Sequence, residues 1–317
     1  MVWRKNQGDV VKYRLVTRSD FDGLVCAVLL RHLDMIGEIK FVHPKDVQDG
    51  EVEVTENDIL TNLPYAPGAY MVFDHHHSET LRNESNLENH VIDPDAPSAA
   101  RVIYGYFGGK ERFPQVSDEL MRAVDQADSA AYALEDILNP QGWTLMNFLM
   151  DSRTGLGRFR EFRISNYQLM MQLIDACIEH DEVGGILALP DVKERADLFH
   201  EQHDLFVEQL KRVSHLDGDV VVVDLRDEEV IHAGNRFMVY ALFPQARVSV
   251  HAIWGRQKLN TVFACGKSIL DRTSPADVGE VMLRYGGGGH VAAGTCQVPH
   301  DQAERVEKEI VEALKSI

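Results

Sequence analysis

The sequence predicts an α/β protein in which a parallel sheet with helices on both faces is joined through a helical connector to a smaller α/β lobe. Short apolar runs alternate with helical segments early in the chain, and strand-like runs return after a mostly helical stretch. The 317 residues also suffice for two hydrophobic cores. We expect a first domain over residues 1–190, a helical linker over 191–216 and a second domain over 217–317.

The first part of the chain begins as strand, loop and helix. Tyr13–Thr17 has the pattern of a short buried strand, and Leu24–Met35 is helical by length and pattern. Ligand sites of parallel sheets form at the carboxyl ends of strands, so the residues after each strand are the candidates for function. Further strands are expected at Ile39–Val42, Ile59–Thr61 and Tyr70–Phe73, and helices at Ser98–Phe107 and Ser117–Ala127.

The later part of the chain changes from helices to a second sheet. Ser165–His215 is predicted to be mostly helical, with breaks at Gly184-Gly185 and at Pro190. Strands are then expected at Asp219–Asp224, Arg247–Trp254 and Thr261–Cys265, a hairpin turn at Gly255–Lys258, and helices at Ala276–Tyr285 and Gln302–Ile317.

The composition limits the classes of partner. A formal charge of −18 argues against a protein that coats long nucleic acid, whereas small anionic substrates remain compatible with it. Residues 235–290 carry seven Lys or Arg against three acids, a local balance of +4 that indicates either an anion pocket or a chance cluster of solvated charges. The sequence is compatible with a homodimer.

The sequence also gives expectations about location. No run approaches the roughly 18 apolar residues of a membrane helix, and the first residues lack the apolar stretch of a signal peptide. The four cysteines are far apart, so neither a disulfide framework nor a thiolate zinc site is indicated. We therefore expect a cytoplasmic protein that does not contact a membrane.

Acidic and histidine residues follow two of the expected strands. Asp20 and Asp22 come after the first strand, where they offer the oxygen ligands of hard divalent cations, although such a loop is as often a turn or helix cap. Asp74, His75, His76 and His77 follow a later strand, and carboxylate with imidazole suits manganese, iron, cobalt or zinc. Both groups are expected at the same sheet edge.

Two further segments complete the candidate site. The helix that ends near Asp125 and Asp128 offers one more carboxylate, with a solvated helix-end acid as the alternative. Four glycines, Gly286–Gly289, precede His290, so backbone amides there could approach an anion without side-chain obstruction. A flexible turn is the alternative for a glycine run.

In this order and spacing, these segments resemble the DHH phosphoesterase superfamily, and most closely its exopolyphosphatase-like group, near relatives of enzymes that degrade very short RNAs (nanoRNA) and linear dinucleotides such as pGpG. The resemblance implies that His76 assists catalysis and that His290 touches substrate with Gly287, Gly288 and Gly289. It implies as metal ligands Asp20, Asp22, Asp74, His75 and Asp128.

The sequence departs from the family pattern at two positions. Asn62 stands at the expected place of a metal-bridging aspartate, with Asp58, at the other end of the same strand, as the alternative. Arg18 stands where the first motif has a metal-binding histidine, and a guanidinium cannot ligate a metal. One ion site would then be weakened or absent, with Arg18 holding a substrate phosphate in catalysis.

The predicted function is metal-dependent hydrolysis of short linear nucleotides, pGpG or RNA of two to five nucleotides, to mononucleotides. The expected cofactor is Mn²⁺, as one or two ions, with Mg²⁺ or Co²⁺ as alternatives. An exopolyphosphatase, or a degenerate protein that binds nucleotides without turnover, are the alternative functions. The residues expected to bind substrate include Arg236, and Arg153, Arg158, Arg160 and Arg163 from the stretch 151–163.

Overall fold

The computed structural model describes residues 12–76, 79–80, 87–159, 162–180 and 182–315. Contacts divide the chain into two compact units. The first unit comprises Met1–Ala131, Gln141–Asp151 and Glu161–Glu194, and the second comprises Tyr132–Pro140, Ser152–Arg160 and Arg195–Ile317. The assignment of a catalytic and a substrate-binding role to the predicted domains stays a prediction.

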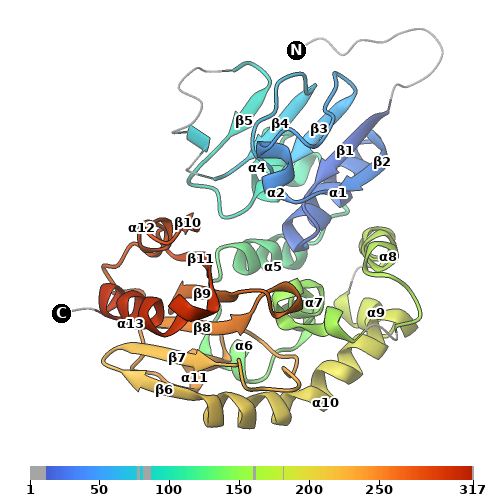
Figure 1. Ribbon diagram of the computed structural model, residues 1–317. Helices are drawn as coiled ribbons and strands as arrows, with labels where there is room; N and C mark the ends of the chain where they lie inside the picture. The colour runs from blue at the N-terminus through green and yellow to red at the C-terminus, as the bar shows by residue number, and fades with distance from the viewer. Residues whose placement is uncertain (1–11, 77–78, 81–86, 160–161, 181, 316–317) are drawn as a thin grey trace, which may run out of the picture. The chain divides into compact units, whose positions relative to one another are not determined.

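A five-stranded sheet, all parallel, forms the centre of the first unit (Figure 1). Its strand order is β2-β1-β3-β4-β5, which confirms the predicted parallel sheet. The sequence did not indicate the last strand, because three half-buried residues are too few for a pattern. The strands are β1 (Tyr13–Thr17), β2 (Ile36–Phe41), β3 (Asp58–Thr61), β4 (Met71–Asp74) and β5 (His90–Ile92).

Helices cover both faces of this sheet. Successive strand residues point to opposite faces, and on one face Val72 belongs to an apolar cluster with Val47 of helix α2. On the other face the ring of Phe73 packs against Tyr106 and Phe107 at the end of α4. The helices of this unit are α1 (Phe21–His32), α2 (Pro44–Gln48), α4 (Ala99–Tyr106), α5 (Asp118–Asp128), α7 (Gly142–Met150), α8 (Asn166–Glu179) and α9 (Val183–Leu187).

The helical stretch after residue 165 differs from its prediction in two details. Gly184 and Gly185 lie inside α9 rather than at a break, and Pro190 begins helix α10 (Pro190–Val213), because proline fits the first turn of a helix. The predicted end of the helical stretch, at about His215, agrees with the end of α10, after which β6 (Ser214–Asp217) pairs with β7 (Val220–Asp224) in a hairpin. Gly218 lies in its turn with φ +66°.

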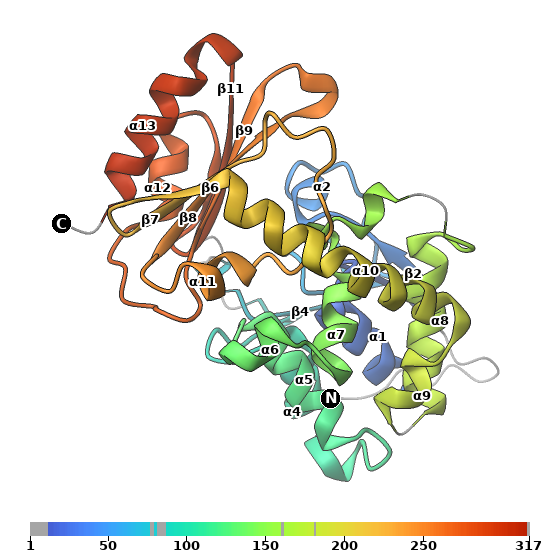
Figure 2. The same ribbon diagram turned by 90° about the horizontal axis from the view of Figure 1, so that it is seen from below.

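The second unit contains a six-stranded mixed sheet of order β10-β11-β9-β8-β7-β6. Only β7 and β8 pair in parallel, and α12 and α13 pack on one face of the sheet (Figure 2). The other strands are β8 (Val248–Trp254), β9 (Thr261–Lys267), β10 (Gly288–His290) and β11 (Ala293–Val298). The other helices are α6 (Leu134–Leu138), α11 (Met238–Leu242), α12 (Val278–Leu283) and α13 (Ala303–Leu314).

The core of the second unit follows the strand alternation. Val248, Val250 and Ala252 of β8 are buried in one cluster with residues of α12 and α13, such as Met282 and Ile310. The closing helix is therefore amphipathic, as predicted, and covers the sheet with its apolar face. None of the helices in the described part of the chain is long and apolar enough to cross a membrane.

Candidate metal centre

The loop between β1 and α1 holds both predicted acids. Asp20 is the N-cap of α1, with its Oδ1 accepting from the Gly23 amide at 2.9 Å. Asp22 lies in the first turn and is buried. The chain packs tightly here, because a Cβ on Gly23 would lie 2.0 Å from the carbonyl oxygen of Arg18. The Asp-x-Asp-Gly pattern is thus a helix cap whose second acid points into the protein.

Asp22 is held by the start of a second helix. Both of its carboxylate oxygens accept backbone amides at the N-terminus of α4, from Ala99 at 2.9 Å and Ala100 at 2.8 Å. Burial, followed by the negative charge of Asp128, raises the pKa of Asp22 to about 7. This buried carboxylate is therefore fixed in position beside a second carboxylate, and the charge of His75 offsets only part of the cost of ionising it.

The end of strand β4 places Asp74, His75 and His76 at the same edge of the sheet as the loop between β1 and α1. Asp74 is fully buried, and its Oδ1 accepts from the His75 amide at 2.8 Å and lies 2.7 Å from His76 Nδ1. Nδ1 of His75 lies 3.2 Å from the carbonyl oxygen of Ala96. Donation to that carbonyl leaves the Nε2 lone pair of His75 available as a ligand. His77 lies outside the described residues.

Of the two acids near the end of α5, Asp128 faces the centre. Asp125 instead accepts hydrogen bonds from Ser98 Oγ at 2.8 Å and Arg101 Nε at 2.9 Å. Asp128 Oδ2 lies 3.0 Å from Nε2 of His75. Asp125 thus forms a structural ion pair, and Asp128, the acid that the resemblance implies, is the candidate ligand.

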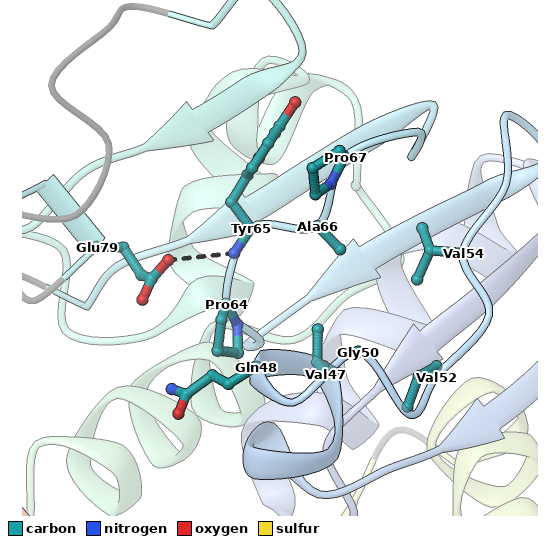
Figure 3. Close-up of a pocket in the computed structure, with 10 residues that line it drawn as sticks. All are labelled: Val47, Gln48, Gly50, Val52, Val54, Pro64, Tyr65, Ala66, Pro67 and Glu79. Atoms are coloured by element: carbon teal, nitrogen blue, oxygen red, sulfur yellow. Dashed lines mark hydrogen bonds between the residues drawn. The ribbon is translucent and has the colours of Figure 1, made fainter.

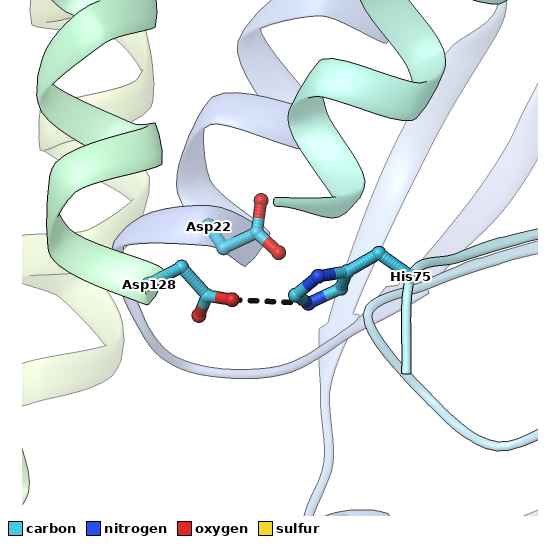
Figure 4. A group of neighbouring side chains, drawn as sticks. All are labelled: Asp22, His75 and Asp128. Atoms are coloured by element: carbon cyan, nitrogen blue, oxygen red, sulfur yellow. Dashed lines mark ion pairs between the residues drawn. The ribbon is translucent and has the colours of Figure 1, made fainter. Parts of the chain in front are cut away.

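Asp22, His75 and Asp128 form one group from three elements (Figure 4). Their ligand atoms all lie within 4.8 Å of one another, close enough to hold one ion. Burial lowers the pKa of His75, but the contact with Asp128 and the charges of Asp22 and Asp74 outweigh it and raise the pKa to about 9. In the absence of a metal, a proton on His75 therefore supplies part of the missing positive charge.

Buried polar atoms without hydrogen-bond partners support a cation at this edge. Among the described residues, Nε2 of His75, Oδ2 of Asp74 and Oδ1 of Asn62 are buried without a hydrogen-bond partner. The 3.0 Å approach of His75 to Asp128 is thus an ion-pair contact without hydrogen-bond geometry. Oxygen and imidazole donors of this kind fit a divalent manganese-type ion. The residues present therefore fit the metal that the resemblance implies.

The two positions that depart from the family pattern lie beside Asp20. Asn62, with φ +54°, donates from Nδ2 to Asp20 Oδ1 at 3.1 Å, and Arg18 Nε lies 2.9 Å from Asp20 Oδ2. Asp58 is engaged elsewhere, in an ion pair with Arg14 at 2.6 Å. Asn62 is thus the residue near the acidic loop, and Arg18 contributes the positive charge next to Asp20.

Comparison with solved structures gives matches over nearly the whole chain. No protein-family model matches the chain, and no curated protein matches it. Among solved structures, PggH of Vibrio cholerae, a pGpG-specific phosphodiesterase, is 55% identical, with 96% of this chain and 99% of that chain covered and a TM-score of 0.84.

The chain belongs to the DHH phosphoesterase superfamily.

More distant structures share the fold alone. Exonuclease RecJ bound to manganese is 14% identical, with 95% of this chain and 90% of that chain covered and a TM-score of 0.51. RecJ of Thermus thermophilus in complex with Mn²⁺ is 15% identical, with 95% and 52% covered and a TM-score of 0.51. These likenesses agree with the predicted DHH fold.

The glycine-rich motif of this DHH chain begins in the turn after α12, where Gly286 has φ +72°, and continues as an edge strand. Gly288–His290 pairs with β11, and Gly287 and Gly289 leave no space for a side chain, since an added Cβ would lie 2.1 and 2.3 Å from backbone oxygens. Gly288 faces open space, and His290 is exposed. The glycines therefore permit close strand packing and also leave backbone accessible.

The predicted substrate-binding arginines divide between the units. Arg236 lies over the ring of Phe237 at 4.1 Å, and Arg158 donates to the Ile231 carbonyl at 3.5 Å. Arg153, Arg158 and Arg236 belong to the second unit with the glycine motif, whereas Arg163 belongs to the first unit, where it pairs with Asp191 at 3.6 Å. Arg160 lies outside the described residues.

Sequence reasoning missed the residues that support the ligands. Ser98 caps α4 through the Arg101 amide at 3.0 Å and also donates to Asp125, so α4 and α5 are tied together next to Asp22 and Asp128. Arg101 adds a two-nitrogen ion pair to Asp125. A serine before a predicted helix was a visible capping signal, but its link to α5 required the tertiary structure.

Proposed function

We propose that this protein is a metal-dependent phosphodiesterase that hydrolyses short linear nucleotides, with pGpG as its substrate, to mononucleotides. The observation that carries the proposal is the group of Asp22, His75 and Asp128 in a chain 55% identical to a pGpG-specific phosphodiesterase over nearly its full length. RecJ structures contain Mn²⁺ or Mg²⁺, which supports a divalent ion. We propose Mn²⁺, with Mg²⁺ or Co²⁺ as alternatives.

The proposed ligands are Asp22, His75 and Asp128, with Asp74 and Asn62 contributing the buried oxygens beside them. When bound, a divalent ion lowers the pKa of water and stabilises negative charge on phosphoryl oxygens. The protein's own contribution is rigidity. The carbonyl of Ala96 orients His75, so its ligand atom needs no rearrangement before it binds.

His76 is the proposed proton donor. Its Nδ1 lies 2.7 Å from Asp74 Oδ1, and the side chain is 42% exposed, so Nε2 is left for substrate. Burial lowers the pKa of His76, but the hydrogen bond and charge of Asp74 outweigh it and raise the pKa. The imidazolium that this favours can hold a proton at Nε2 and deliver it to the leaving oxygen of the phosphodiester.

The position of Arg18 affects how many metal ions the centre can bind. Its guanidinium pairs with Asp20, to which Asn62 also donates, so Asp20 already has a cation and a hydrogen-bond donor. We propose that Asp20 positions the acidic loop and that a single ion binds strongly, at Asp22, His75 and Asp128. Arg18 is 39% exposed, which keeps its proposed role at a substrate phosphate open to test.

We propose that the second unit contributes substrate-binding residues of its own. Its exposed His290 and open Gly288 fit a phosphate or sugar oxygen, and Arg153, Arg158 and Arg236 supply positive charge in a chain of formal charge −18. A few cations suffice for a dinucleotide, whereas long nucleic acid requires many. The proposal therefore favours short substrates.

The test is chromatography of products after incubation with pGpG, longer RNA or polyphosphate, in Mn²⁺ and then in EDTA. We expect GMP from pGpG only with Mn²⁺, and none from Asp74→Ala. Asp118→Ala is the matched control, because this acid is 68% exposed. Phosphate released from polyphosphate alone would instead identify an exopolyphosphatase.

A second outcome would favour a binding protein. The pairing of Arg18 with Asp20 is the observation that supports this alternative, because it reduces the negative charge available to a second ion. Binding of pGpG with no product from any substrate, in Mn²⁺, Mg²⁺ or Co²⁺, would make the protein a nucleotide sensor and refute the proposed hydrolysis.

A further inference from the structure

A pocket of about 670 Å³ lies within the first unit and is not accounted for by the metal centre (Figure 3). Helix α2, the segment after it and the loop after β3 surround the pocket. Its volume lies within the roughly 300–1,000 Å³ of small-molecule sites. Six of its ten lining residues are aliphatic or proline: Val47, Val52, Val54, Pro64, Ala66 and Pro67.

The pocket shares lining residues with a cavity at the edge of the metal centre. A smaller cavity of about 80 Å³ is lined by Asn62, Asp74 and His76 of that centre. Gln48, Pro64 and Glu79 line both cavities. The two cavities are therefore neighbours within the first unit, with Gln48, Pro64 and Glu79 between the metal centre and the larger pocket.

The chemistry of the two ends differs. At the shared end, Glu79 is only 3% exposed, and its Oε2 accepts from the Tyr65 amide at 3.1 Å. A buried carboxylate disfavours an anion and accepts from N–H or O–H groups. Beyond it, the aliphatic wall favours an uncharged group with apolar faces. The best-fitting occupant is a neutral planar group with polar edges, attached to a phosphate at the metal centre.

We propose that this pocket binds the nucleobase of the nucleotide whose phosphate lies at the metal centre. The inference rests on the proposed function and extends it, because it assigns substrate affinity to a surface that contains no metal ligand. The ribose would pass Gln48 and Glu79, and the base would pack against Val47, Val54 and Ala66. The base adds at least a tenfold gain in affinity.

The test compares the binding of GMP with that of ribose 5-phosphate by calorimetry in Mn²⁺. The two ligands share the phosphate and ribose, so their ratio isolates the base. Native protein should bind GMP at least tenfold more tightly. Val54→Phe extends a ring into the pocket and should reduce GMP binding to the level of ribose 5-phosphate, while the binding of ribose 5-phosphate stays unchanged.

Two further variants protect this test from misfolding. Pro67→Trp blocks the pocket from an exposed position that does not line the smaller cavity, and it should reproduce the selective loss of GMP binding. Val230→Phe is the matched control, since Val230 is 51% exposed in the second unit and lines neither cavity. Thermal unfolding of each variant checks that it remains folded.

The proposal is overturned if native protein binds the two ligands equally, or if both pocket variants retain the preference for GMP. It is also overturned if both lose the two ligands in the same proportion. Hydrolysis of pGpG is measured separately. A pocket-dependent preference for GMP without hydrolysis would refute the proposed activity alone, and hydrolysis without that preference would refute the pocket alone.

Discussion

Replacing Asp22 with Asn removes a charge while keeping the shape of the side chain. In the metal-free protein, burial and the charge of Asp128 raise the pKa of Asp22 from 3.8 to about 7. One pKa unit corresponds to about 1.4 kcal/mol, so ionised Asp22 costs the fold about 4 kcal/mol above pH 7. Asn avoids this cost but cannot accept both the Ala99 and Ala100 amides, a loss of about 1–3 kcal/mol.

The net expectation is that metal-free Asp22→Asn is more stable than the native protein by about 1–3 kcal/mol at pH 8. A carboxyl group whose pKa is raised by folding destabilises the fold as the pH rises above 3.8, and the cost is complete above about 7. The advantage of Asn should therefore shrink by about 3 kcal/mol between pH 8 and pH 5, leaving the variant no more stable than native.

The measurement is urea unfolding in EDTA at both pH values, with calorimetric titration of Mn²⁺ in parallel. The variant should lose strong metal binding while gaining stability at pH 8, and the exposed control Asp118→Asn should show neither change. A variant that is less stable than native at pH 8, with the same difference at pH 5, would refute the assignment of Asp22 as a buried, only partly compensated ligand.

Three other predictions test the centre. Because the pKa of His75 is about 9 without metal, Mn²⁺ must displace a proton when it binds. The affinity for Mn²⁺ should therefore rise by up to about tenfold per pH unit from pH 7 to 9. A calorimetric affinity that does not change over this pH range would contradict the prediction. His76→Asn should lower kcat by about 10²–10⁴-fold while Mn²⁺ affinity stays near native, and loss of both would instead indicate a ligand. Arg101→Met should lower the free energy of unfolding in urea by about 2 kcal/mol, because its partner Asp125 is only 18% exposed, and it should weaken Mn²⁺ binding. Arg101→Lys should recover part of both losses. If Arg101→Met binds Mn²⁺ as tightly as the native protein, the ion pair has a purely structural role.

Local patterns predicted the strands of the first sheet well. Tyr13–Thr17 matches β1 in both bounds, and Ile59–Thr61 lies within β3, because apolar runs between polar loops form buried strands. Short elements escaped prediction. Helix α2 has five residues and β5 three, and segments of that length are stabilised by neighbours distant in sequence.

The sequence by itself indicated the α/β class, the acidic and histidine residues at the strand ends, and the unusual Arg18. These follow from patterns within a few residues and from the resemblance to a family. The resemblance also selected Asp128 rather than Asp125, but only the tertiary structure showed what approaches each of them: Arg101 pairs with Asp125, and His75 lies beside Asp128. The tertiary structure also decided between Asn62 and Asp58 as the residue beside Asp20, since packing determines which distant groups meet.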